Sequence, residues 1–205
     1  MKKDTDYKKR DLLIESAKKE FKEKGYNKAS LRDICANAGV TTGALYFFFE
    51  NKADLFSAIV DAPLKGLKKI IMDHFAEDVD YMGSIKDLDK IEMDHSDVTD
   101  AFVDYIYSYY DSFILILTAS ENTVYENCVD ELVDMTQSAI PMMIAKLPGY
   151  TYDKFMSHWM AHTTIEAFIN VIKHEPDVEV AKKKLRPIMN YLVQGWVTLA
   201  MVKEE

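Results

Sequence analysis

The sequence predicts an all-α fold. The chain of 205 residues contains only seven Gly and five Pro, so few positions interrupt regular structure. Most of its length lacks the alternation of apolar and polar residues that is typical of strands. Apolar residues recur instead at the spacing of one helix face, and the hydrophobic content of 48% suffices for a packed core.

The first predicted helix runs from Lys8 to Lys24. Its apolar positions Leu13, Ala17 and Phe21 lie on one face. Gly25 follows, and glycine readily adopts the left-handed conformation that ends a helix. The sequence therefore begins with an amphipathic helix.

A second, short helix is predicted over residues 31–37. Ser30 precedes it and Asp33 is its third residue, so the two side chains are expected to form a capping box. In this arrangement each side chain accepts a hydrogen bond from a backbone N–H at the start of the helix. The residues that we expect this helix to bury are Leu31, Ile34 and Cys35.

A third helix is predicted over residues 42–48, after a turn at Gly39 and a cap at Thr41. Two short helices joined by a turn with Gly are typical of a helix-turn-helix, whose second helix enters the major groove of DNA. Leu45 and Phe49 are expected to face inward. The residues expected to face outward are Thr42, Gly43, Tyr46 and Phe47.

The aromatic residues of this third helix have a use against DNA. An exposed Phe47 would be poorly placed in water, but its ring can pack on thymine methyl groups. Tyr46 can donate its hydroxyl to a phosphate oxygen. Asn51 and Asp54 are expected to cap the next helix, whose N-terminal Lys52 is placed to attract phosphate. Phe48 fits either the core or the surface.

The charge of the chain is unevenly distributed. The formal net charge is −9, which argues against nucleic acid as a partner of the whole surface. Residues 1–60, however, hold twelve Lys/Arg against nine Asp/Glu, whereas residues 61–205 hold thirteen against twenty-five. This asymmetry indicates a basic contact surface on an acidic body.

The stretch "AGVTTGALYFFFENKADLF" resembles the signature of the tetracycline-repressor (TetR) family of bacterial regulators, and the resemblance extends back through "LLIESAKKEFKEKGYNKASLRDICANAGV". It covers a head of about 50 residues and implies a DNA-binding domain over 1–50 and an effector-binding and dimerisation domain over 51–205. By resemblance, the base-reading surface comprises Thr41, Thr42, Gly43, Ala44, Tyr46 and Phe47. The implied phosphate contacts are Ser30, Arg32, Tyr46 and Lys52.

One departure from the family pattern concerns positions 47 and 48. These positions usually hold Tyr, His or Trp in the family, whereas this chain has Phe at both. The double Phe removes hydrogen-bonding groups, so the base preference of relatives does not transfer.

The body is predicted to begin with a helix that has a break or kink near Pro63 and ends near Gly83. Residues 73–100 hold ten acidic side chains against Lys86 and Lys90, and we expect a solvated face there. A long aromatic stripe follows over residues 102–117. It is predicted to form one helix, either as core or as the lining of a ligand pocket.

By resemblance, this part of the body would line the effector cavity of the family. The effector is an unknown small molecule, and the balance of acids and aromatic rings leans towards a lipophilic cation. The candidate lining residues are Phe102, Tyr105, Ile106, Tyr109, Phe113, Met135, Met142, His162 and Glu166.

Three further helices are predicted over residues 124–147, 152–174 and 178–203. Pro141 is expected to bend the first of these. The last two carry apolar residues on more than one face, which requires a second apolar surface as cover. By resemblance, they would pair with their copies in a homodimer, and a two-fold dimer suits a near-palindromic operator.

His158, His162 and Glu166 follow one another at four-residue intervals along one predicted helix. Neighbouring His pairs can bind zinc, but the ends of this stripe are about 12 Å apart along the axis. We therefore expect hydrogen bonding at an interface or pocket, with no metal and no cofactor. The lone Cys35 and Cys128 are expected to be buried thiols.

The sequence favours a non-enzymatic, ligand-responsive transcriptional regulator, most simply a repressor, that binds a double-stranded DNA operator as a homodimer. A DNA-binding protein without an effector and a helical metal-dependent enzyme are the alternatives. No segment approaches the roughly 18 apolar residues that span a bilayer, and no secretion signal opens the chain, so a cytoplasmic location without membrane contact is expected.

Overall fold

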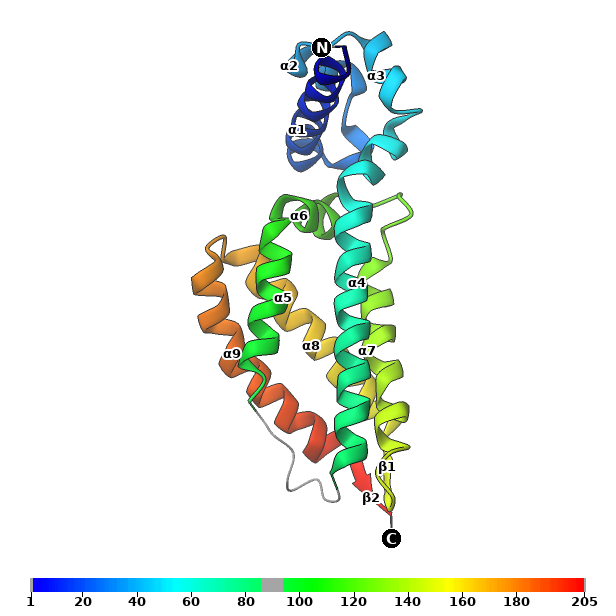
Figure 1. The fold of residues 1–205 in the computed structure, drawn as a ribbon, viewed down its shortest axis with the longest axis vertical. Helices are drawn as coiled ribbons and strands as arrows, with labels where there is room; N and C mark the ends of the chain where they lie inside the picture. The colour runs from blue at the N-terminus through cyan, green and yellow to red at the C-terminus, as the bar shows by residue number, and fades with distance from the viewer. Residues whose placement is uncertain (1, 86–93, 205) are drawn as a thin grey trace. The chain divides into compact units, whose positions relative to one another are not determined.

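The computed structural model describes residues 2–85 and 94–204. Figure 1 labels its helices and strands in chain order. Over these residues the fold is all-α, as predicted, apart from two strands of three residues each. The elements are α1 (Lys2–Lys28), α2 (Leu31–Ala38), α3 (Thr42–Phe48), α4 (Lys52–Ser84), α5 (Ser96–Ser108), α6 (Tyr110–Ala119), α7 (Cys128–Ile144), β1 (Tyr150–Tyr152), α8 (Lys154–His174), α9 (Val178–Gly195), a π-helical turn (Trp196–Ala200) and β2 (Met201–Lys203).

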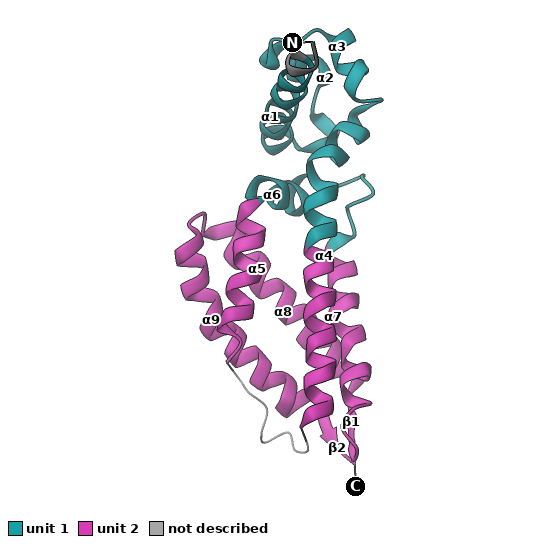
Figure 2. Ribbon diagram, in the orientation of Figure 1, with its two compact units in different colours: residues 1–66, 109–128 teal, residues 67–108, 129–205 magenta. Residues whose placement is uncertain are grey.

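The chain packs as two compact units, coloured separately in Figure 2. The first unit runs up to Gly66 and includes Tyr109–Cys128. The second comprises Leu67–Ser108 and the chain from Val129 onward. By packing, α6 therefore belongs with the N-terminal helices, although it follows α5 in sequence. The functional division into residues 1–50 and 51–205 stays a prediction.

Helix α1 begins earlier than predicted, at Lys2, and its apolar face is fully buried at Leu13, Ala17 and Phe21. The predicted helix end at Gly25 is a real interruption, because this residue has φ 73° and ψ 165°. The chain then makes a further helical turn to Lys28. Only glycine adopts this backbone conformation without strain.

Helix α4 runs from Lys52 to Ser84 with Pro63 inside it, so the predicted break at Pro63 is wrong, and a kink there stays a prediction. The predicted end near Gly83 is confirmed, since Ser84 is the last helical residue. Of the acidic segment 73–100, residues 86–93 lie outside the described part of the chain.

The aromatic stripe over residues 102–117 does not form one helix. Tyr109 leaves the helical conformation with φ −126° and ψ 33°, which separates α5 from α6. Helix α6 is anchored within the first unit, where the buried Ser112 hydroxyl donates to the Ile59 carbonyl at 2.9 Å. The apolar periodicity of the sequence therefore continues across Tyr109, although α5 packs in the second unit and α6 in the first.

The C-terminal elements also differ from the prediction. Helix α7 starts at Cys128 instead of residue 124, and it contains Pro141 in its last part. Tyr152 and Lys203, predicted at helix ends, lie in strands. Strands β1 and β2 pair antiparallel, with Tyr150 opposite Lys203 and Tyr152 opposite Met201.

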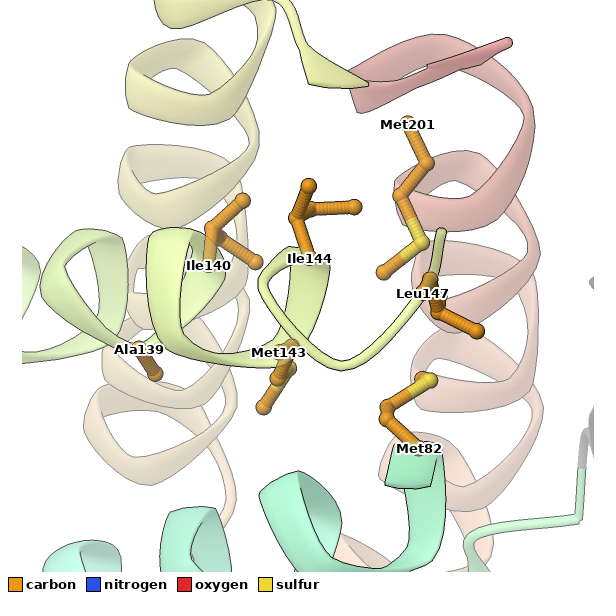
Figure 3. Close-up of a cluster of buried hydrophobic side chains, with 7 residues drawn as sticks. All are labelled: Met82, Ala139, Ile140, Met143, Ile144, Leu147 and Met201. Atoms are coloured by element: carbon orange, nitrogen blue, oxygen red, sulfur yellow. The ribbon is translucent and has the colours of Figure 1, made fainter. Parts of the chain in front are cut away.

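The core of the second unit joins the end of α4, α7 and β2. Its buried side chains, drawn in Figure 3, are Met82, Ala139, Ile140, Met143, Ile144, Leu147 and Met201. Three of these are methionines from three different elements, whose flexible thioethers fill irregular space. At these positions Met serves as core.

Candidate nucleic-acid interface

Helix α3 has the predicted boundaries, Thr42–Phe48, and its N-terminal end is fixed by local interactions. The Thr41 hydroxyl accepts a hydrogen bond from the Ala44 N–H at 3.2 Å, which confirms the predicted cap. The preceding turn is made by Gly39 in the left-handed conformation, with φ 64°. Val40 N–H closes the turn by donating to the Cys35 carbonyl at 3.0 Å. The short helix is therefore held in place at its N-terminus.

Helices α1, α2 and α3 share one core in the first unit. Ile34 and Leu45 are fully buried, and Phe49 is nearly so. The Ser16 hydroxyl of α1 donates to the Ile34 carbonyl of α2 at 2.9 Å. Burial raises the pKa of the Cys35 thiol, and its hydrogen bond with Thr42 partly opposes this effect. A buried Cys35 agrees with the prediction.

The start of α2 departs from the predicted capping box. The Ser30 hydroxyl accepts from the Asp33 N–H at 3.3 Å, as expected. The Ser30 N–H, however, donates at 3.1 Å to Glu20 of α1 and not to Asp33. Asp33 instead pairs with Lys24, whose ammonium also binds Glu20. The predicted burial of Leu31 is wrong too, because this side chain is only half-buried.

Glu20 is a residue that sequence reasoning missed. Its side chain is 3% exposed and joins the α1 helix to the entry of α2 through the Ser30 N–H and Lys24. A buried carboxylate is stable only when it is paired and hydrogen-bonded. In the sequence, only its position next to the apolar face of α1 indicated that Glu20 is buried.

The outward face of α3 exposes the residues predicted to read bases. Phe47 is 75% exposed and Tyr46 is 55% exposed. Thr41, Thr42 and Gly43 are exposed as well, while Ala44 is half-buried. The helix carries no charged residue in its first or last turn. Its exposed surface therefore combines the hydroxyl groups of Thr and Tyr side chains with the phenyl ring of Phe47.

Positive charge in this unit comes from the neighbouring helices. Lys8, Lys9 and Lys28 of α1 and Arg32 of α2 are exposed. If α3 reads bases, these basic side chains are available for phosphate contacts. Ser30, in contrast, is half-buried and its hydroxyl already serves as a cap.

Lys52 does not present a free ammonium for a phosphate. Its Nζ donates to the carbonyls of Tyr26, Asn27 and Ala29 at 2.8, 3.2 and 3.2 Å. It also lies 4.7 Å from the centre of the Tyr26 ring. An ammonium has three donors, so these carbonyls occupy all of them. In this structure Lys52 ties the end of α1 to the start of α4, and its phosphate contact stays a prediction.

The nine candidate pocket residues are not a single group. Tyr109 and Phe113 belong to the first unit, and the other seven belong to the second. Met142 and Glu166 are exposed on α7 and α8. His162 makes an edge-to-face contact with His158 at 4.6 Å between ring centres. The His158 Nδ1 lies 3.0 Å from Gln137 Oε1, so this histidine takes part in a hydrogen bond.

A second cluster of ionisable groups was not predicted. His74 and Asp78 of α4 lie 3.3 Å apart between Nε2 and Oδ2, and the rings of Phe75, His95 and Phe102 surround His74. Burial lowers the pKa of His74 and raises the pKa of Asp78 to about 6. Within residues 2–85 and 94–204, no three His, Cys, Asp or Glu side chains are arranged to hold a metal ion.

The helices described here include none with both the length and the apolar character required to cross a membrane.

Comparison with known proteins concerns mainly the N-terminal head. Residues 13–59 match the sequence profile described as "Bacterial regulatory proteins, tetR family". The chain is similar to the HTH-type transcriptional repressor BepR of Brucella suis, with 43% identity over 51 residues, which is 25% of this chain and 24% of that protein. The match thus spans about a quarter of the curated relative.

Solved structures share the fold over most of the chain. A transcriptional regulator from Aquifex aeolicus has a TM-score of 0.57 and 17% identity, covering 90% of this chain and 99% of that one. A gamma-butyrolactone receptor has a TM-score of 0.51 and 17% identity, covering 94% and 86%. At this identity the likeness concerns the fold.

Proposed function

We propose that the chain is a regulator of the tetR family, whose profile matches residues 13–59, and that it binds a near-palindromic DNA operator as a homodimer and is released by a small-molecule effector. A repressor is the simplest form of such a regulator, since the similar BepR protein is named as one. Catalysis has no part in this function.

The observation that carries the proposal is the exposed, uncharged face of α3. Two hydroxyl-bearing side chains, Thr42 and Tyr46, stand beside the exposed ring of Phe47. These groups can donate to base edges, bind phosphate and contact base methyl groups in a major groove. With Arg32 on the preceding helix, they form the proposed DNA surface. Lys52 holds the connection between α1 and α2, which leads to Arg32.

A second exposed surface supports the homodimer. Large apolar side chains of α8, α9 and the π-helical turn remain in solvent within one chain, and they are Phe155, Trp159, Ile188, Tyr191 and Leu199. Phe155 and Tyr191 are 73% and 74% exposed, which is costly for rings of this size. A second copy of the chain would cover them with an identical surface, as in two-fold dimers.

Effector control is proposed for the body. Candidate contacts in the second unit are the half-buried Phe102, Tyr105, Met135 and His162. The likeness in fold to a gamma-butyrolactone receptor, a protein named for a small ligand, supports this role. An effector that prefers one dimer geometry by 1–3 kcal/mol weakens DNA binding about 5–150-fold. Such a geometry would no longer match half-sites roughly 34–36 Å apart.

Selection of bound sequences from random double-stranded DNA tests the proposal with the full chain. We expect a near-palindromic consensus whose half-sites are about one helical turn apart. No enrichment by folded, dimeric protein would refute it. A compound screen for thermal shifts then tests the effector: a compound that stabilises the protein and lowers operator affinity supports release, whereas stabilisation without any change in affinity contradicts it.

A further inference from the structure

We propose that Phe47 recognises the C5 methyl group of a pyrimidine in each operator half-site. The protein would then bind thymine more tightly than uracil at that position, and 5-methylcytosine more tightly than cytosine. This inference rests on the proposed function, because it assigns a chemical group of DNA to the exposed face of α3.

The first observation is the exposure of the Phe47 ring. It is 75% exposed, whereas the next aromatic residues, Phe48 and Phe49, are half-buried and buried. An apolar ring in water gains free energy from any apolar partner that covers it. In the major groove the C5 methyl of thymine is the apolar group that a base edge presents.

The second observation is the support behind this ring. Phe47 meets Phe48 edge-to-face with ring centres 5.0 Å apart, and Phe48 lies 6.4 Å from Phe49. Phe49 is 2% exposed, and Arg10 of α1 lies over its ring at 5.4 Å. Through these contacts the exposed Phe47 ring adjoins the buried Phe49 of the first unit.

The third observation is the absence of polar groups on the Phe47 side chain. A phenyl ring has neither a donor nor an acceptor, so it cannot distinguish the O4 of thymine from the N4 of cytosine. The methyl group is therefore the feature of the base to which Phe47 responds. Thr42 and Tyr46 supply the hydroxyl groups for the remaining contacts.

The expected size of the effect follows from the burial of one methyl group. Its removal lowers affinity about fourfold, which corresponds to about 0.8 kcal/mol. In a palindromic site both half-sites contribute, so loss of both methyl groups lowers affinity about fifteenfold.

The test is a scan of the selected operator in which each thymine in turn is replaced symmetrically by uracil. This exchange removes a methyl group and leaves every hydrogen-bonding group of the base pair intact. We expect one position per half-site to lose about fifteenfold in affinity, measured by fluorescence anisotropy with the full chain. At a cytosine placed there, C5 methylation should recover a similar factor.

Variants assign the effect to Phe47. Phe47→Ala should bind the thymine and uracil operators equally, and its exposure predicts an unchanged helical content by circular dichroism. Tyr46→Phe is the matched control, which should keep the wild-type ratio between the two operators. Equal affinity of the wild type for the thymine and uracil operators at every position would overturn this inference but not the proposed function. The same holds if Phe47→Ala keeps the wild-type ratio between the two affinities. Absence of specific DNA binding would overturn the proposed function with it.

Discussion

Replacement of Lys52 by Met distinguishes a structural role for this residue from a phosphate contact. The variant keeps most of the aliphatic side chain but removes the three donors that bind the Tyr26, Asn27 and Ala29 carbonyls. A hydrogen bond with a charged group contributes about 1.5–3 kcal/mol. The three bonds of Lys52 do not add up to three times this value, because one half-buried ammonium makes all of them and water can bind the carbonyls in its place. We expect local destabilisation of about 1–3 kcal/mol at the α1–α2 connection.

Hydrogen exchange of the full chain, measured on peptides that cover residues 26–34, is the assay. A loss of 1–3 kcal/mol accelerates exchange by local opening about 5–150-fold. The salt dependence of operator binding should keep its wild-type slope. Lys19→Met, which removes an exposed charge from α1, is the control and should leave exchange in this region unchanged.

Unchanged exchange together with a salt slope reduced by about 1.8, or about 0.9 for each Lys52 of the dimer, would refute this assignment, because that pair of results identifies a phosphate contact.

Three further predictions concern other parts of the chain. Glu20→Gln should lower the free energy of unfolding by about 1–3 kcal/mol in urea titrations, because the buried charge binds the Ser30 N–H and Lys24; an unchanged value would contradict this role. Burial raises the folded pKa of Asp78 to about 6, so its effect on stability becomes unfavourable as pH rises from about 4 to 6. The free energy of unfolding of Asp78→Asn, measured by urea titration, should therefore exceed that of the wild type by about 1–2 kcal/mol at pH 7.5, after allowance for solvent screening, and by about a third of that at pH 4.5. An equal increase at both pH values would contradict the raised pKa of Asp78. Trp159→Asp should yield monomers in sedimentation experiments, unlike Val124→Asp at an exposed site of the first unit, and persistence of the dimer would exclude α8 from the interface.

The sequence was most informative where short-range interactions determine structure. The boundaries of α3 follow from the Thr41 cap, the Gly39 turn and the inward spacing of Leu45 and Phe49, all of which involve residues close in sequence. The exposure of Tyr46 and Phe47 follows from the same helical period. A cap or turn depends little on distant parts of the chain, so these features could be predicted.

Features that depend on distant residues were not predicted. The apolar period continues across Tyr109, and only the packing of α6 in the first unit explains the break there. Lys52 binds carbonyls 23 to 26 residues away, whereas its place at a helix N-terminus and the family pattern implied a phosphate contact. Strands β1 and β2 pair residues about 50 positions apart, a contact that short segments do not indicate.

In the candidate site, too, the features set by nearby residues were predicted and those set by distant residues were not. Local pattern identified the exposed face of α3, whereas Glu20 and Arg10 could be assigned only once α1 was seen to pack against α2 and α3. The effector pocket depends entirely on how helices meet, and its nine candidates are divided between two units. Their role stays a prediction.

The most direct test of the central claim, that the exposed face of α3 reads DNA, is a comparative selection from random DNA. The full chain would be compared with a variant carrying Ala at Thr42, Tyr46 and Phe47. These side chains are exposed, so the variant should fold and dimerise like the wild type. We predict a near-palindromic consensus for the wild type and no enriched sequence for the variant. Enrichment of the same consensus by both proteins would contradict the claim.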